Sequence, residues 1–97
     1  NIFGLKIENI SKETTKKYDL FDSEGVVITY IKKNGAAYRA GLHAGDIILE
    51  INRYPINSKI DYEKELKKIS ESKKILALIK TPDYSRYVVL RAGKLPN

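Results

Sequence analysis

The chain has 97 residues, of which 42% are hydrophobic, and 18 Lys and Arg against 12 Asp and Glu give it a formal net charge of +6. This length accommodates one hydrophobic core and excludes two. No segment is apolar over the ~20 residues that a membrane-spanning helix needs, and the lack of cysteine excludes disulfides and thiolate chemistry.

The positive charge is scattered along the chain. Several lysines stand beside glutamates, as in the stretch that holds Lys64, Glu65, Lys67, Lys68 and Glu71. Proteins that bind single-stranded nucleic acid typically combine basic and aromatic residues in one stripe, and this chain has no such stripe. The charge therefore fits a solvated surface, and we expect no nucleic-acid partner.

The hydrophobic pattern predicts the order strand, helix, strand, short helix, strand, long helix, strand, strand. The expected strands cover residues 2–10, 26–31, 47–52, 75–79 and 87–90, and the expected helices cover residues 12–20, 36–40 and a longer stretch from residue 58 onward. Period-two alternation or β-branched residues identify the strands. Residues 75–79 form a continuous apolar run, which predicts a strand buried on both faces.

Polar residues and glycine mark the ends of these elements. Ser11 and Ser58 are the expected N-caps of the first and last helices. Gly41 stands just past the short helix, where a positive φ costs glycine little. Tyr54 and Pro55 end the third strand or lie at its edge.

Candidate catalytic residues are scarce. The one histidine, His43, lies in an expected turn, and a serine triad needs a nucleophile, a base and an orienting acid. Neither a Gly-x-Ser-x-Gly elbow nor a P-loop sequence is present. One histidine without cysteine leaves too few ligands for a zinc site. We therefore expect no catalytic residue, no metal and no cofactor.

A glycine at the start of the chain predicts a binding loop. Gly4 stands between two bulky apolar residues, and glycine allows a backbone to turn consecutive N–H groups outward. Such a nest holds a carboxylate, so we expect a carboxylate-binding loop made of Ile2, Phe3, Gly4 and Leu5. The competing interpretation is a glycine at the first residues of an ordinary strand.

The long helix and the first strand predict a groove between them. An extended peptide would add to the outer edge of the strand, and its last side chain would enter a pocket lined by Phe3, Leu5 and Leu66. The residues expected along the groove are Ile7, Tyr62, Glu63, Leu66, Lys67 and Ile69. Phe3 and Leu66 are expected to lie nearer the groove, and Ile7 and Ile69 mostly in the core.

Four blocks of sequence together resemble the PDZ domains of the Do-like (HtrA/DegP) family of trypsin-like serine proteases. They are Phe3-Gly4-Leu5, the stretch from Ile10 to Leu20, the apolar strand after Gly25 with the Ala-rich helix and Gly-Asp turn that follow, and residues 74–91. The last block looks more like the second PDZ domain of these proteases than the first.

This resemblance implies a fold and a function. The fold would be α+β, a small, mostly antiparallel β-sandwich or partly open barrel of about five strands with a long and a short helix, in the bacterial circularly permuted arrangement. Residues 1–92 would form the domain and residues 93–97 a tail or linker. The domain would be a non-catalytic module that captures C-termini or unfolded segments.

The same resemblance implies a parent protein. That protein would be a periplasmic or otherwise exported serine protease, with the protease domain in the same chain and a possible homo-oligomer. Two alternatives stay open. The domain could be an assembly contact with an idle groove, or it could belong to a C-terminal-processing or site-2 protease.

Overall fold

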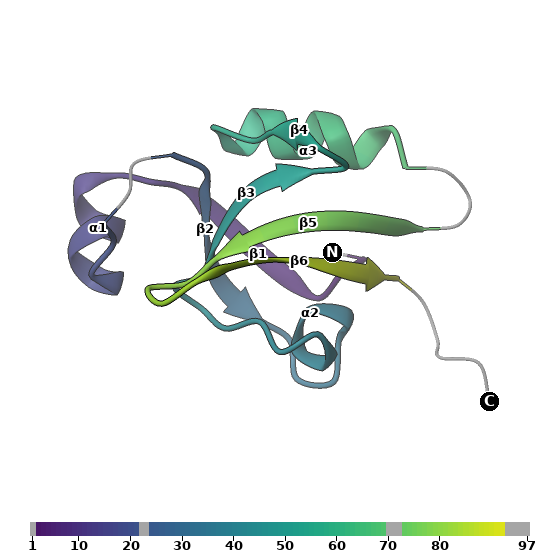
Figure 1. The fold of residues 1–97 in the computed structure, drawn as a ribbon, viewed down its shortest axis with the longest axis horizontal. Coiled ribbons are helices and arrows are strands. Elements are labelled where there is room, and N and C mark those ends of the chain that lie inside the picture. Colours follow the sequence, from purple (N-terminus) through teal and green to yellow (C-terminus); the bar gives the residue numbers. More distant parts are fainter. Residues whose placement is uncertain (1, 22–23, 70–72, 93–97) are drawn as a thin grey trace.

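An antiparallel sheet forms the framework of the protein (Figure 1). The computed structural model describes residues 2–21, 24–69 and 73–92. The elements are β1 (Leu5–Asn9), α1 (Lys12–Tyr18), β2 (Val26–Ile31), α2 (Ala36–Arg39), β3 (Ile47–Ile51), β4 (Tyr54–Pro55), α3 (Lys59–Lys67), β5 (Lys74–Lys80) and β6 (Ser85–Arg91). The strands lie in the order β1-β2-β3-β5-β6, and β4 pairs with β3 off this path. The predicted α+β class is confirmed.

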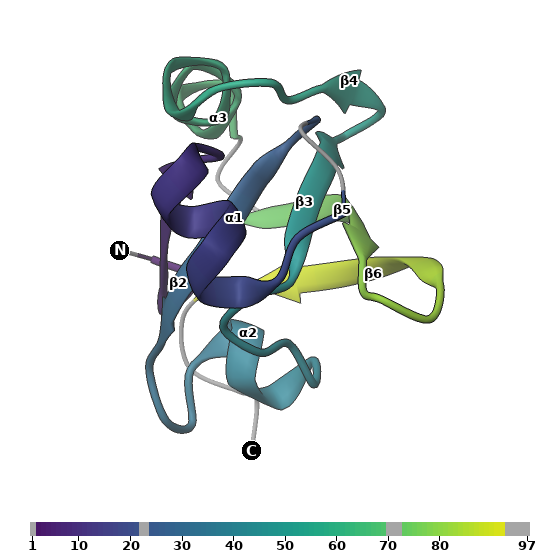
Figure 2. The same ribbon diagram turned by 90° about the vertical axis from the view of Figure 1, so that its left-hand side faces the viewer.

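The helices lie on different sides of this sheet. In Figure 1, α3 lies above the strands, α2 below them and α1 to the left. Figure 2 shows β1 and α3 towards one side of the molecule and β6 towards the other. The described strands at the two ends of the sheet, β1 and β6, therefore face different surroundings.

The core is filled mostly by branched aliphatic side chains from the inward faces of the strands. Side chains that are completely buried include Phe3, Val26, Ile28, Ile48, Ile51, Ile56 and Ile79. Burial of a side chain of this size stabilises the fold by about 1.5–3 kcal/mol. The expected β-branched strands thus supply most of the apolar packing.

The two predicted N-caps and the glycine after the short helix are confirmed, whereas α1 ends at Tyr18, two residues before the predicted end. The Ser11 hydroxyl accepts a hydrogen bond from the Thr14 N–H at 3.1 Å, and the Ser58 hydroxyl accepts one from the Asp61 N–H at 3.1 Å. Gly41 follows α2 with φ +80°. No helix in the described part of the chain is long and apolar enough to cross a membrane.

The first strand is shorter than the alternation predicted. It begins at Leu5 rather than at residue 2, because the residues before it form a turn. Gly4 takes a positive φ of 69°, and the Phe3 carbonyl accepts a hydrogen bond from the Ala37 N–H at 3.0 Å. The backbone at Phe3 is therefore hydrogen-bonded to α2, and the chain joins the sheet only after this contact.

The prediction that residues 75–79 are buried on both faces is wrong. Ile75, Ala77 and Ile79 are buried, but Leu76 and Leu78 on the other face are only half-buried. Their face carries no helix among the described elements, so a continuous apolar run does not guarantee two covered faces. The predicted tail, residues 93–97, lies outside the described residues.

Candidate functional site

The open edge of β1 is the main candidate for a binding site. In the described sheet β1 pairs with β2 on one side, and α3 runs past its other side (Figure 1). A groove of about 510 Å³ lies between them, with Ile7, Tyr62 and Leu66 as its apolar residues. Lys6, from the opposite face of β1, also borders it, so the groove follows the edge of the strand.

A hydrogen bond at the first turn of α3 joins this helix to β1. The Lys59 N–H donates to the Asn9 side-chain oxygen at 2.7 Å. The first N–H groups of a helix have no partner within the helix, so Asn9 completes the helix start and ties it to the end of β1.

The backbone of β1 presents hydrogen-bond donors to the groove. The Gly4 carbonyl accepts from the Lys32 N–H at 2.8 Å, and the Lys6 carbonyl accepts from the Thr29 hydroxyl at 3.5 Å, both on the β2 side. In a trans peptide the next N–H points the opposite way. The N–H groups of Leu5 and Ile7 therefore point to the open edge, two residues apart, the spacing that pairs with an added strand.

The loop before β1 turns two backbone N–H groups away from their neighbours in the fold. Because the Phe3 carbonyl points to Ala37, the N–H of Gly4 points away from α2. Together with the Leu5 N–H it forms two consecutive donors, and the positive φ of Gly4, 69°, makes this turn possible. Such a pair of donors suits a carboxylate.

The predicted loop residues differ in their exposure. Phe3 and Leu5 have 0% and 1% of their surface exposed and belong to the core. The expectation that Phe3 lies nearer the groove than Ile7 is wrong, since Ile7 borders the groove and Phe3 does not. The loop contributes backbone to this site, and Ile7, Tyr62 and Leu66 supply the apolar side chains.

The predicted groove residues divide into two groups. Ile7, Tyr62, Glu63 and Leu66 border the groove. Lys67 is exposed and Ile69 packs against the core, and neither borders it. Sequence reasoning missed Lys6, Glu8, Thr29 and Lys59. Helical spacing could have found Lys59, because it stands four residues before Glu63 and seven before Leu66 on the same face.

The turn that holds His43 supports the fold. His43 is exposed, and its N–H donates to the Asp46 carboxylate at 3.0 Å. Burial raises the pKa of Asp46 above its ordinary value, and the hydrogen bond from His43 opposes that rise. Among the described residues no group of three or more His, Asp or Glu side chains could hold a metal ion.

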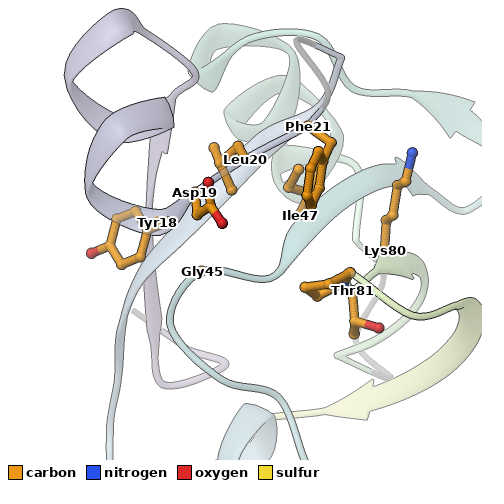
Figure 3. Close-up of a pocket in the computed structure, with 9 residues that line it drawn as sticks. Tyr18, Asp19, Leu20, Phe21, Gly45, Ile47, Lys80 and Thr81 are labelled. Carbon is orange, nitrogen blue, oxygen red and sulfur yellow. The ribbon is translucent and has the colours of Figure 1, made fainter.

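A second, smaller hollow of about 220 Å³ lies where α1 ends, between β3 and the turn that joins β5 to β6 (Figure 3). Tyr18, Leu20 and Phe21 form one wall, and Lys80 and Thr81 lie across from them. It follows no strand edge, so it offers an entering peptide no row of backbone partners. The groove along β1 is the better candidate for peptide binding.

Comparison with known proteins identifies the family of this chain. The sequence pattern of the family described as "PDZ domain" matches residues 1–79. A Chlamydia pneumoniae protein named "Probable periplasmic serine endoprotease DegP-like" is 28% identical over 89 residues, which are 91% of this chain and 18% of that protein. The chain thus spans about a fifth of the length of this relative.

Solved structures show the same fold. The "HtrA-type protease AlgW with decapeptide" superimposes with a TM-score of 0.81 at 20% identity, covering 98% of this chain and 29% of that one. The "HtrA3 PDZ Domain Bound to a Phage-Derived Ligand (FGRWV)" has a TM-score of 0.74 at 18% identity, covering 93% and 81%. The names of both structures state that a peptide is bound.

Proposed function

The chain belongs to the PDZ domain family, and from this premise we propose that it binds C-termini or extended segments of other polypeptides along the open edge of β1. The observation that supports this proposal most directly is the row of outward N–H groups at Gly4, Leu5 and Ile7. At Ile7 this row reaches a groove that also contains Tyr62, Leu66 and four charged residues. An added strand would pair with Leu5 and Ile7, and a terminal carboxylate would accept from Gly4 and Leu5.

The residues that line the groove determine which side chains such a peptide would have. Leu66 is half-buried at the groove, and Ile7 and Tyr62 form its apolar wall. An apolar last side chain would pack there, while Lys6 and Glu63 lie at the rim to meet upstream residues. One short strand and one pocket bury little area, so the affinity would be about micromolar.

The parent protein would be an exported serine protease. Its DegP-like relatives carry the words "periplasmic serine endoprotease" in their names, and this chain would be the module that holds a substrate or partner segment near the protease domain. Such tethering raises the local concentration of substrate without any chemistry in the module itself. The resemblance of residues 74–91 to the second PDZ domain of such proteases remains a prediction.

Amide NMR titration tests the proposal. Peptides with free apolar C-termini should shift the amide signals of Gly4, Leu5, Ile7 and Leu66. C-terminally amidated versions should bind roughly 10- to 100-fold more weakly, because they lose charge-assisted hydrogen bonds worth about 1.5–3 kcal/mol. Equal affinities of the two forms would contradict the proposal that the loop binds the terminal carboxylate. No shift with any peptide in a folded sample would instead favour an assembly contact with an idle groove.

A further inference from the structure

The outer face of β5 and β6 is an exposed apolar surface. The register places Leu76 opposite Val89 and Leu78 opposite Tyr87. All four side chains lie on the face away from the core, since Ile75, Ala77, Val88 and Leu90 fill the other face. Tyr87 and Val89 are each 50% exposed. We call Leu76, Leu78, Tyr87 and Val89 the β5–β6 face.

This face lies away from the groove. In Figure 1, β5 and β6 cross in front of β1, and none of the described helices lies in front of them. In Figure 2, β6 is towards one side of the molecule, and β1 and α3 are towards the other. A molecule bound at the β5–β6 face would therefore leave the groove along β1 accessible.

The charges around the face are mostly positive. Lys74 stands opposite Arg91 at one end, and Lys80 stands opposite Ser85 at the other. The Arg53 guanidinium lies over the Tyr87 ring, 5.9 Å from its centre. One carboxylate, that of Glu50, reaches the face, where it accepts a hydrogen bond from the Tyr87 hydroxyl at 3.2 Å. Among the described residues, Lys74, Arg91 and Arg53 thus border the apolar side chains, together with the Glu50 carboxylate.

We propose that the β5–β6 face docks an acidic polypeptide segment, one whose apolar side chains are flanked by Asp or Glu. Exposed apolar surface rimmed by charge marks interaction sites, and complementary charge selects among partners. The apolar side chains would pack on Leu76, Leu78 and Val89, and the carboxylates would meet the cations at the rim. This inference does not depend on peptide binding at β1.

Charge argues against two other occupants. A second copy of the chain would bring the same cations against this rim, and each chain carries a net charge of +6, so the two faces would repel. A nucleic acid would place phosphates over Leu76, Leu78 and Val89, whose side chains have neither positive charge nor hydrogen-bond donors. It would also place phosphates beside the Glu50 carboxylate, which would repel them. An acidic, partly apolar segment can pack its apolar side chains on the centre of the face and pair its carboxylates with the cations at the rim.

Two matched peptides test the proposal by amide NMR. Both carry an amidated C-terminus and alternate valine with a charged residue, glutamate in one and lysine in the other. The glutamate peptide should shift the amide signals of Leu76, Leu78, Tyr87 and Val89, and the lysine peptide should not. Shifts confined to β1 and α3, or no shift on the β5–β6 face, would overturn the proposal.

Two charge-reversed variants separate local from general attraction. Lys74→Glu changes the rim, whereas Lys64→Glu makes the same change of net charge on the exposed surface of α3. The first should weaken binding of the glutamate peptide about fivefold or more, and the second should change it little. Equal losses would show attraction by net charge alone and contradict a docking site.

Two further measurements address the other occupants directly. Signals of the β5–β6 face should not change with protein concentration when no peptide is present. A concentration-dependent shift there would identify a second copy as the occupant instead. A single-stranded oligothymidylate should bind this face more weakly than the glutamate peptide, and the reverse order would assign the face to nucleic acid.

Discussion

At the scale of single residues, Gly4 carries the most specific requirement of the site. Its φ of 69° belongs to the left-handed region, where other residues lose about 1–2 kcal/mol. A Cβ atom there would lie 3.2 Å from the Gly35 Cα atom, tighter than an ordinary contact. The residue thus serves both the turn and the direction of the N–H groups.

Gly4→Ala should therefore reduce peptide binding as well as stability. Gly41→Ala is the matched control, because Gly41 also has a positive φ, 80°, but its Cβ would make only ordinary contact. Both variants should lose about 1–2 kcal/mol of unfolding free energy in urea titrations. Gly4→Ala alone should weaken binding of a free C-terminus, by roughly tenfold. An undiminished affinity in that variant would mean that the loop does not hold the carboxylate.

At the scale of elements, the sequence pattern identified the strands and helices well and the faces less well. Ser11, Ser58 and Gly41 marked element ends correctly because their chemistry acts locally. The half-buried Leu78 and the fully buried Phe3 were misjudged, since burial depends on which element packs above a residue. Alternation cannot show that Phe3 is completely buried in the core, or that no described helix covers the outer face of β5.

The groove itself was predictable in outline from two elements. The apolar positions Tyr62 and Leu66 follow helical spacing, and Ile7 lies on the inward face of an alternating strand. The link between these elements was not predictable, because Asn9 and Lys59 are far apart in the chain and joined by a contact between a side chain and the backbone. Neither residue type by itself indicates such a partner.

Removing that link should widen the groove. Asn9→Ala leaves the Lys59 N–H at the start of α3 without its side-chain acceptor, which should cost about 1 kcal/mol of stability. Peptide affinity should fall as well, because α3 is no longer held against β1. Asn57→Ala is the control, since Asn57 bonds Asp61 through its backbone N–H. Titration calorimetry and urea unfolding measure both effects, and equal peptide affinities for the two variants would contradict this role of Asn9.

At the scale of the whole molecule, the net charge acts on an approaching peptide over longer distances than the contacts in the groove do. The groove is locally balanced, with Lys6 and Lys59 against Glu8 and Glu63. The chain as a whole carries +6, and a net charge of that size attracts oppositely charged ligands before contact. Any preference for acidic peptides at β1 would therefore arise from the overall field.

This difference predicts a strong dependence on salt. Peptides with the same apolar C-terminus but acidic or basic upstream residues should bind differently at about 0.01 M salt, where charges act over about 30 Å. The acidic peptide should bind faster and more tightly there. The two should converge at about 1 M, where the screening length is about 3 Å. A preference that persists at high salt, measured by stopped-flow fluorescence, would point to direct ion pairs in the groove instead.

The two ends of the sheet also limit how such molecules can associate with one another. At the β6 end, α2 lies alongside the strand, and the Arg86 side chain donates to the Ala40 carbonyl at 3.1 Å (Figure 1). Of the two end strands, β1 is the one with a groove beside its edge. A growing fibril needs an acceptor on each side of every unit. If β1 takes up a segment as proposed, that segment would lie between β1 and α3, so a helix and not a free strand edge would follow it, and the ladder would stop there.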